Sequence, residues 1–356
     1  MGRRVRLGVL AAGVAGAVGI TGLPMTAAQA APAAPPAPRV ERVSVAADGS
    51  EANGGSGAAS ITASGSHIAF SSSATNLTPD TAPRPQSSAH VRDTGTGQVT
   101  RIKSSLSAPV ISGDGRYAAY TDWGTHTVKV FLTDLRTGER KQVGGASKDS
   151  SHRPALSADG RYLAYELRPQ HPADPHRIEV YDRVTDTRET VSGAPQGSTH
   201  DMTAPSLSAD GRYVAFRDAG SGEIWVRDRA KDTLTRVDDG TATALVQLSG
   251  DGRTVAMNSA DGARLRDLRT GRTWEIAGAE AEAVSPDGRH VLYKDAGSTL
   301  RLRKLNNGRE TVVGHGVAGP GAIGAKARTV VYSSPDADVV PGDTNGVNDV
   351  FQWTAR

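Results

Sequence analysis

The sequence predicts an all-β fold, a seven-bladed β-propeller of four-stranded antiparallel blades, with six blades as the alternative. Three observations favour this fold. A hairpin-forming unit recurs seven times, the first six copies are each followed by another strand, a turn and an outer strand, and the chain ends one outer strand short. Successive copies lie 36 to 51 residues apart. Propeller blades repeat about every 40 residues, so this spacing indicates one blade per copy.

The recurring unit reads small residue, any residue, Asp, Gly, Arg, any residue, aliphatic, Ala, aromatic, most clearly in residues 157–165 and 208–216. An Asp side chain can hydrogen-bond to the backbone two residues on, and Gly accepts a positive φ, so Asp-Gly turns the chain between antiparallel strands. We therefore expect the Asp to serve the turn and the aromatic residue to pack between blades. The copies start at Thr62, Ser112, Ser157, Ser208, Ser249, Ser285 and Gly324.

The two ends of the repeat array predict how the ring closes. After the seventh hairpin the chain has a further strand at residues 350–353 but no outer strand. Residues 40–45, before the first hairpin, resemble an outer strand and have no other partner. We expect this N-terminal strand to complete the last blade, because the pairing removes an exposed sheet edge.

The unit resembles the WD40-like (PD40) repeat of the TolB family, and residues 285–293, Ser-Pro-Asp-Gly-Arg-His-Val-Leu-Tyr, match it most fully. The resemblance covers roughly residues 40–354. In that family the propeller is a periplasmic platform that binds protein partners. The resemblance therefore implies a TolB-like propeller with a protein or cell-envelope partner.

The N-terminal 39 residues are predicted to precede the fold. Residues 1–30 combine three early arginines, an apolar run and a terminal Ala-Gln-Ala, which is typical of a cleaved signal peptide. Residues 31–39 are an Ala/Pro tether, and residues 40–356 form a single propeller domain. We expect a secreted or extracytoplasmic protein with no transmembrane span after cleavage; Sec and twin-arginine export are not distinguished.

The composition excludes some classes of partner. Of the 41 Lys and Arg residues three are in the leader, at Arg3, Arg4 and Arg6, so 38 remain against 38 Asp and Glu. A neutral mature chain lacks the basic surface that nucleic acid requires, so no nucleic-acid partner is expected. The chain has no Cys and therefore no disulfide. We expect a monomer whose stability comes from its core.

Two groups of residues depart from the repeat and are candidate sites. The first surrounds the starts of the innermost strands, where loops line one mouth of a propeller channel. Histidines, an arginine and carboxylates at this mouth could bind a ligand, although solvated loop residues are the alternative: His152, Arg153, His200, Asp201, Glu280 and Glu282.

The second group lies in the last blade. Asp343, Asn345 and Asp349 offer oxygen ligands around a Gly turn, which would suit calcium, although the spacing is not that of an EF-hand. The alternative is a structural turn. No other cofactor is expected.

The functional prediction from these features is a non-enzymatic binding or scaffold propeller for protein–protein interaction at the cell envelope. The chain contains no Gly-x-Ser-x-Gly nucleophile motif, and no catalytic residues are assigned. The alternative is an extracellular hydrolase or lyase with its site at the channel mouth. A polar pocket there, with two or more carboxylates or histidines near a common point, would favour the enzyme.

Overall fold

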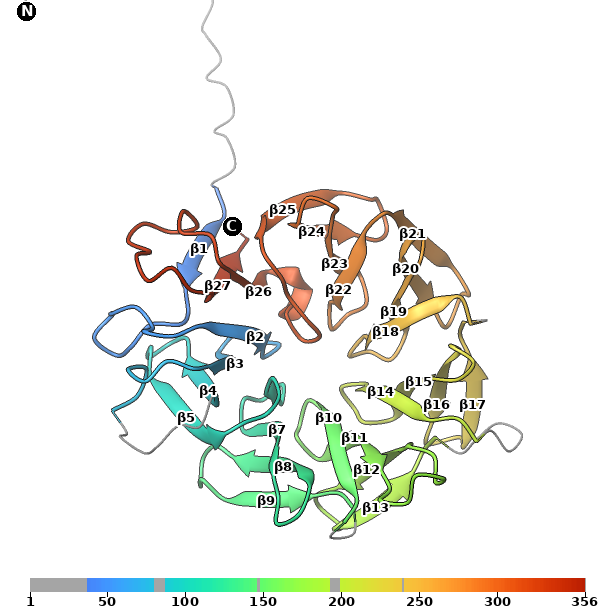
Figure 1. Cartoon of the computed structure of the whole chain (residues 1–356). Helices are drawn as coiled ribbons and strands as arrows, with labels where there is room; N and C mark the ends of the chain where they lie inside the picture. The colour runs from blue at the N-terminus through green and yellow to red at the C-terminus, as the bar shows by residue number, and fades with distance from the viewer. Residues whose placement is uncertain (1–36, 80–86, 146–147, 193–198, 239, 356) are drawn as a thin grey trace, which may run out of the picture. The chain divides into compact units, whose positions relative to one another are not determined.

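Seven sheets are arranged in a ring within the unit Ala37–Arg356 of the computed structural model, and the chain visits them in sequence order (Figure 1). Within the described ranges six sheets have four antiparallel strands and the seventh has three. The predicted seven-bladed propeller is confirmed, and the six-bladed alternative is wrong. The structure describes residues 37–79, 87–145, 148–192, 199–238 and 240–355.

In each four-stranded blade the strands follow one another from the ring centre outward. Blades one to three are β2 (Ser56–Ile61), β3 (His67–Ser72), β4 (Ser88–Asp93), β5 (Val99–Ser104); β6 (Val110–Ile111), β7 (Tyr117–Trp123), β8 (Val128–Asp134), β9 (Arg140–Val143); and β10 (Ser150–Leu156), β11 (Tyr162–Arg168), β12 (Arg177–Asp182), β13 (Thr187–Thr190). Blades four to six are β14 (Met202–Leu207), β15 (Tyr213–Asp218), β16 (Ile224–Asp228), β17 (Thr233–Arg236); β18 (Ala242–Leu248), β19 (Thr254–Ser259), β20 (Gly262–Asp267), β21 (Thr273–Ala277); and β22 (Glu280–Val284), β23 (His290–Lys294), β24 (Thr299–Lys304), β25 (Glu310–His315). Blade seven contains the 3-10 helix η2 (Ala325–Ala327) and the strands β26 (Thr329–Ser334), β27 (Asp349–Thr354) and β1 (Arg39–Arg42).

Both ends of the chain close the seventh blade. Strand β1 pairs antiparallel with β27, from Arg39 opposite Thr354 to Arg42 opposite Phe351. The predicted closure by the N-terminal strand is therefore confirmed. The innermost position of this blade is taken by residues 317–323, which reach β26 through two isolated bridges rather than a continuous strand.

The Asp-Gly turns explain why the unit recurs. In blade three Ser157 Oγ donates to Asp159 Oδ1 over 2.7 Å, and the backbone N–H of Arg161 donates to the same oxygen over 3.0 Å. Gly160 has φ of 65°, and a Cβ there would lie 2.2 Å from the ring of Tyr117 in the preceding blade. The glycine is thus required by the turn and by the contact between blades.

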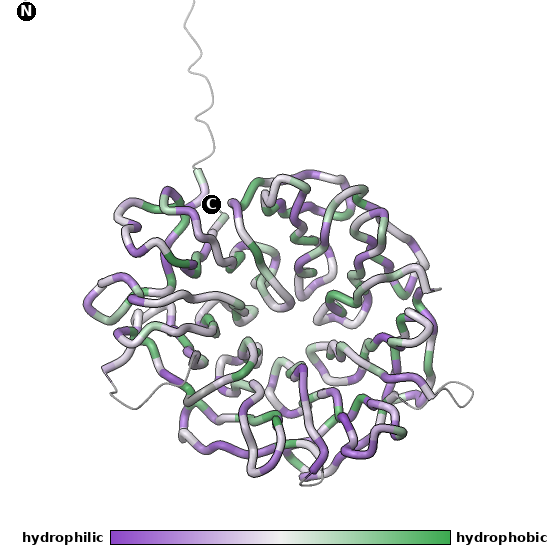
Figure 2. The backbone as a smooth tube through the Cα atoms, in the orientation of Figure 1, coloured by the Kyte–Doolittle hydropathy of each residue, from purple (hydrophilic) through white to green (hydrophobic). Residues whose placement is uncertain are grey.

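The core lies between neighbouring blades, all around the ring. The aromatic column of the repeat is fully or almost fully buried, as predicted, and Figure 2 shows hydrophobic stretches distributed through every blade. Its most buried members are Phe70, Tyr120, Tyr165, Phe216 and Tyr332. Stability is therefore distributed over many blade interfaces.

The predicted signal peptide, residues 1–30, and most of the tether lie outside the described residues. The first strand begins at Arg39, one residue before the predicted start of the domain. Across the described ranges, no helix has the length and apolar character needed to cross a membrane.

Candidate functional site

The two faces of the ring carry different parts of the chain. We call the face with the Asp-Gly turns the turn face. The opposite face, where the innermost strands begin and where the second and third strands of each blade are connected, is the loop face. Because strands within a blade are antiparallel, residues at the start of β10 and at the end of β11 meet on the loop face.

A buried carboxylate organises the loop face between blades three and four. Glu166, on β11, is 1% exposed and accepts hydrogen bonds from Arg168 Nε over 2.6 Å and from Thr203 Oγ1 over 2.6 Å. Arg153 Nε lies 3.4 Å and His176 Nδ1 lies 3.6 Å from its two oxygens. Glu166 therefore joins one cationic residue of β10, one of β11, a histidine before β12 and a hydroxyl of the next blade.

Asp201 ties the same histidine to blade four. The backbone N–H of His176 donates to Asp201 Oδ1 over 2.8 Å, and Nδ1 of the ring lies 3.5 Å from Asp201 Oδ2. The N–H of Met202 donates to the backbone oxygen of His176 over 3.0 Å. One imidazole nitrogen thus faces two carboxylates, Glu166 and Asp201, from different blades.

His152 lies beside this group on β10. Its Nε2 is 3.1 Å from Ser150 Oγ. Burial, together with the nearby Arg168 guanidinium, lowers the pKa of His152 below its usual value of 6.5. The ring is therefore uncharged at neutral pH and keeps a nitrogen lone pair that can accept a proton.

Arg153 stands where a β-bulge interrupts the pairing of β10 with β11. Its φ of 52° is positive, as are those of Ala58 and Ala204 at the matching bulges of β2 and β14. Bulges redirect side chains, and here the redirected side chain is long and cationic instead of a methyl group. The side chain is 60% exposed, and Arg153 is one of the residues that line the central cavity of the ring.

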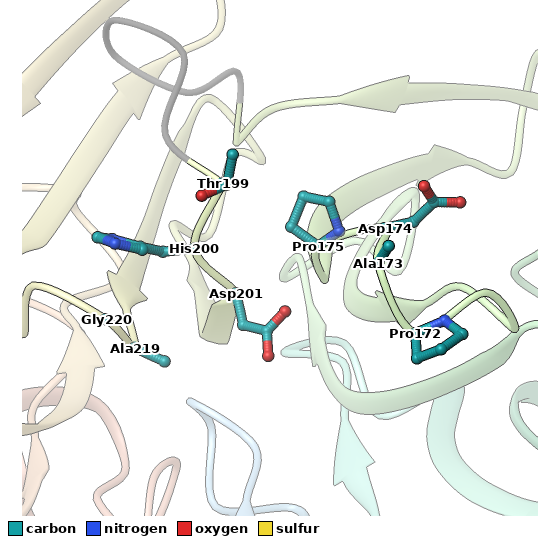
Figure 3. A pocket seen from close by; sticks show the side chains of 9 residues that line it. All are labelled: Pro172, Ala173, Asp174, Pro175, Thr199, His200, Asp201, Ala219 and Gly220. Carbon is teal, nitrogen blue, oxygen red and sulfur yellow. The ribbon is translucent and has the colours of Figure 1, made fainter.

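A polar pocket of about 390 Å³ adjoins the group, between the loop before β12 and the start of blade four (Figure 3). Pro172 and Pro175 form one side, and His200 and Asp201 form the other. His200 Nδ1 lies 3.0 Å from Asp218 Oδ1. Burial alone would raise the pKa of Asp218, but hydrogen bonds from two backbone N–H groups and from His200 outweigh it and lower the pKa.

Of the six residues predicted at the mouth, the structure brings His152, Arg153 and Asp201 to the group around Glu166, and His200 lines the adjoining pocket. His152 and Arg153 lie within β10 rather than in a loop, and His200 and Asp201 lie just before β14. Glu280 and Glu282 belong to a separate group on β22, where both pair with Lys294, at 3.0 and 3.2 Å. Burial raises the pKa of Glu282.

Sequence reasoning missed the organising carboxylate and three of its partners, Arg168, His176 and Thr203. A signal for Glu166 was available, because it directly follows the aromatic residue of the repeat. That position is polar in every blade but never forms a constant column: Ser71, Thr121, Glu166, Arg217, Asn258, Lys294 and Ser333.

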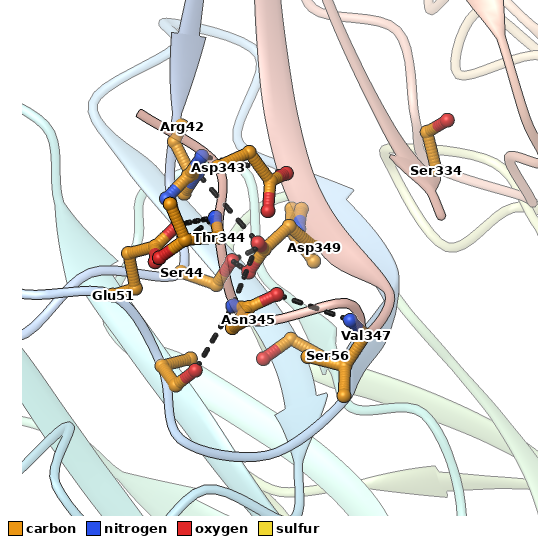
Figure 4. A network of polar contacts seen from close by, with 12 residues as sticks. Arg42, Ser44, Glu51, Ser56, Ser334, Asp343, Thr344, Asn345, Val347 and Asp349 are labelled. Atoms are coloured by element: carbon orange, nitrogen blue, oxygen red, sulfur yellow. Dashed lines mark hydrogen bonds and ion pairs between the residues drawn. The ribbon is translucent and has the colours of Figure 1, made fainter. Parts of the chain in front are cut away.

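The residues of the predicted calcium site lie against the N-terminal strand (Figure 4). Ligand oxygens of Glu51, Asp343 and Asp349 lie within 4.8 Å of one another, and within the described ranges this is the only group of three His or acidic residues so arranged. The Arg42 guanidinium pairs with Glu51 and lies 3.4 Å from Asp343 and 3.6 Å from Asp349. Asn345 donates to Asp349 over 3.1 Å.

Asp349 is fully buried, and this burial raises its pKa. Ser44 Oγ donates to its other oxygen over 2.5 Å. The group therefore joins both ends of the chain through polar contacts, with Arg42 supplying positive charge among the carboxylates. Calcium binding at Asp343, Asn345 and Asp349 stays a prediction.

Comparison with known proteins finds similarity of fold. No family model and no curated protein matches the sequence. An oligogalacturonate lyase in complex with manganese aligns over 89% of this chain and 93% of that one, with 14% identity and a TM-score of 0.63. An oligogalacturonate lyase from Vibrio parahaemolyticus covers the same shares with 12% identity and a TM-score of 0.59.

Two further propellers are similar. The propeller domain of Cps50 (Swd1) from Myceliophteria thermophila aligns over 85% of this chain and 97% of that one, with 15% identity and a TM-score of 0.57. TolB from Acinetobacter baumannii aligns over 75% of this chain and 65% of that one, with 18% identity and a TM-score of 0.49. The predicted resemblance to WD40-like propellers is confirmed as a resemblance of fold.

The prediction of a non-enzymatic scaffold for protein partners is corrected by these comparisons. Two lyases, which are enzymes, share the ring over 93% of their own lengths. A ring of this kind therefore accommodates catalysis without an additional catalytic domain, and the fold gives no ground for excluding an enzyme. The physical reason is that a propeller separates its structural repeat from the variable residues of one face.

Proposed function

We propose that this chain is an exported lyase that cleaves acidic oligosaccharides on its loop face, between blades three and four. The observation that carries the proposal is the convergence of Arg168, His152 and His176 around Glu166. The lyases with a similar ring support the class of reaction. Export rests on the predicted signal peptide at residues 1–30.

Cleavage of a uronate by β-elimination needs a group that binds the sugar carboxylate and groups that move protons. Arg168 would bind the carboxylate, since its Nε is held by Glu166 while the side chain remains 38% exposed. A carboxylate neutralised in this way makes the hydrogen on the adjacent carbon more acidic. Glu166 acts as a positioning residue, because its oxygens are taken up by neighbouring side chains.

His152, uncharged at neutral pH, would take the proton from the carbon next to the carboxylate. A double bond then forms between this carbon and the adjacent ring carbon, as the bond from that adjacent carbon to the glycosidic oxygen breaks. His176 would supply a proton to the leaving oxygen, with Glu166 and Asp201 orienting its ring. The step needs no oxidant or reductant.

The test is to incubate the purified chain with oligogalacturonate and to follow the ultraviolet absorbance of the unsaturated product. We expect His152→Gln to lower kcat by roughly a hundredfold or more, as for loss of a general base. The matched control is His315→Gln, a 60% exposed histidine on β25. Absence of unsaturated product from oligogalacturonate and from other oligouronates would overturn the proposal.

The pH profile provides a second measurement. Because the pKa of His152 is lowered, its neutral form persists below pH 6.5. The acidic limb of kcat/KM should therefore lie below that pH, and activity should fall as His152 becomes protonated. An acidic limb above pH 6.5 would contradict the assignment of His152 as the base.

A further inference from the structure

The centre of the ring contains a second cavity with a different chemistry. Its volume is about 510 Å³, within the range of roughly 300–1,000 Å³ typical of small-molecule sites. Its walls come from the innermost segments of six blades and are largely apolar. Representative lining residues are Ile61, Val110, Leu156, Leu207 and Leu245.

Three polar side chains of this wall, Ser60, Ser206 and Gln247, make contacts between blades. Ser60 Oγ donates to the backbone oxygen of Pro109 over 3.2 Å, and Ser206 Oγ accepts from the N–H of Leu248 over 2.9 Å. Gln247 Oε1 accepts from two backbone N–H groups of blades six and seven, at 3.1 and 3.3 Å. These groups stabilise the ring and leave the apolar character of the cavity dominant.

Arg153 is the charged residue of the cavity wall; among the described lining residues no other is ionisable. The bulge that carries it is repeated in blades one and four, where alanines occupy the position. The ring therefore does not need an arginine there. Arg153 and Arg168 share the single carboxylate of Glu166, and the nearer partner at 2.6 Å is Arg168. The Arg153 side chain is 60% exposed and only 3.4 Å from Glu166, so its guanidinium has room for a second anionic partner.

We infer that the central cavity binds a small amphiphilic carboxylate, with its apolar tail against the innermost strands and its carboxylate on Arg153. Burial of the tail supplies affinity, and a guanidinium pairs with a carboxylate through two parallel hydrogen bonds, which selects the anion. This ligand is distinct from the proposed oligosaccharide, which has no long apolar part. The site therefore goes beyond the proposed function.

The experiment is isothermal titration calorimetry of the purified chain with dodecanoate, below its micelle-forming concentration. The comparison ligand is dodecyltrimethylammonium, which has the same tail and the opposite charge. We expect saturable binding of dodecanoate and at least tenfold weaker binding of the cation. Equal affinity for both ligands, or no binding of dodecanoate, would overturn the inference.

Two variants locate the site. Arg153→Ala should weaken dodecanoate binding roughly tenfold or more, which is the loss of one charge-assisted pair. The double variant Arg153→Ala/Ala204→Arg moves the charge to the matching bulge of the next blade and should restore the preference for the anion. Circular dichroism checks that each variant is folded. A folded Arg153→Ala chain that binds dodecanoate with unchanged affinity would place the ligand elsewhere and sink the proposal.

A third variant tests the cavity itself. Val110 lies on β6 and is partly exposed to the cavity, so Val110→Trp fills space without removing a fully buried side chain. We expect this variant to lose dodecanoate binding while it keeps the secondary structure of the intact chain. Retained binding in the folded variant would contradict an internal site and leave surface adsorption as the explanation.

Discussion

The turn face and the loop face of this propeller are built by the same strands but obey different rules. On the turn face the same contacts recur: Arg161 pairs with Asp182 and Arg212 with Asp228, each through two guanidinium nitrogens. On the loop face the residue that follows the aromatic position of the repeat varies among the blades, and only blade three has a carboxylate there, Glu166. Because the recurring contacts of the turn face hold each blade, the side chains of the loop face can vary from blade to blade.

This contrast distinguishes charged residues that stabilise the repeat from charged residues that are candidates for function. A charged residue that recurs in register has a role that each blade needs, such as a turn or an interblade contact. A buried charge at a position that is uncharged in several other blades is not required by the ring. Glu166 satisfies the second description.

The largest effect on stability is expected in blade seven, on the loop face. Arg42→Ala removes the cation from Asp343, Glu51 and the buried Asp349, and loss of one partner of a buried ion pair costs about 3–5 kcal/mol of unfolding free energy. Urea unfolding at neutral pH measures this loss of unfolding free energy. Arg42→Lys is the matched control, which keeps the charge and should lose less.

The same variant sharpens the calcium prediction. Without Arg42, the three carboxylates have no cation among them, so added calcium should raise the Tm of Arg42→Ala more than that of the intact chain. If added calcium left the Tm of Arg42→Ala unchanged, the prediction that Asp343, Asn345 and Asp349 bind calcium would be wrong.

A somewhat smaller effect is expected on the turn face. Gly160→Ala places a Cβ against Tyr117 at a positive φ, and the combined steric and backbone strain should cost about 2–4 kcal/mol. Gly138→Ala is the matched control, since Gly138 also has a positive φ, of 75°, but no atom within 4 Å of the added Cβ. Its cost should be about 1 kcal/mol. Equal losses of unfolding free energy in the two variants would show that the interblade contact does not constrain the turn.

An acid-dependent effect is expected for the recurring ion pairs. Hydrogen bonds from the Arg161 guanidinium lower the pKa of Asp182 from 3.8 to about 2. A lowered pKa in the folded state stabilises the protein above the unfolded pKa, and this stability is lost as the pH falls from about 4 to about 2.

The matching measurement is urea unfolding of Asp182→Asn and the intact chain at a series of pH values. The difference should be about 1–2 kcal/mol at pH 6 and should shrink towards pH 2. A difference that stays constant over this range would mean that Asp182 acts through packing instead of charge.

The sequence was sufficient to predict the ring because each blade repeats the same local chemistry. The Asp-Gly turn, the aromatic column and the spare N-terminal strand are visible in the residues themselves, and the structure confirms all three. Pairing between strands then follows from the order of the chain. The innermost segment of blade seven was less predictable, since residues 317–323 form only isolated bridges.

The candidate site was only partly predictable, because its residues belong to three strands and two loops of different blades. His152 and Asp201 break the repeat and could be identified from the sequence. Glu166 could not be paired with Thr203, 37 residues away, without the placement of blade four against blade three. Glu280 and Glu282 break the repeat as well, yet the fold assigns them to Lys294.

The smallest effect on stability is expected for an exposed carboxylate of the loop face, Glu280. Glu280 is 59% exposed and pairs with Lys294 over 3.0 Å, so Glu280→Gln should change the unfolding free energy by at most about 0.5 kcal/mol. The buried Glu166 makes its contacts at 1% exposure, and Glu166→Gln should cost about 1–3 kcal/mol because charged partners lose their carboxylate. Urea unfolding of both variants compares two carboxylates of one face. Equal losses of unfolding free energy in Glu280→Gln and Glu166→Gln would contradict the view that burial decides how much a carboxylate on this face contributes to stability.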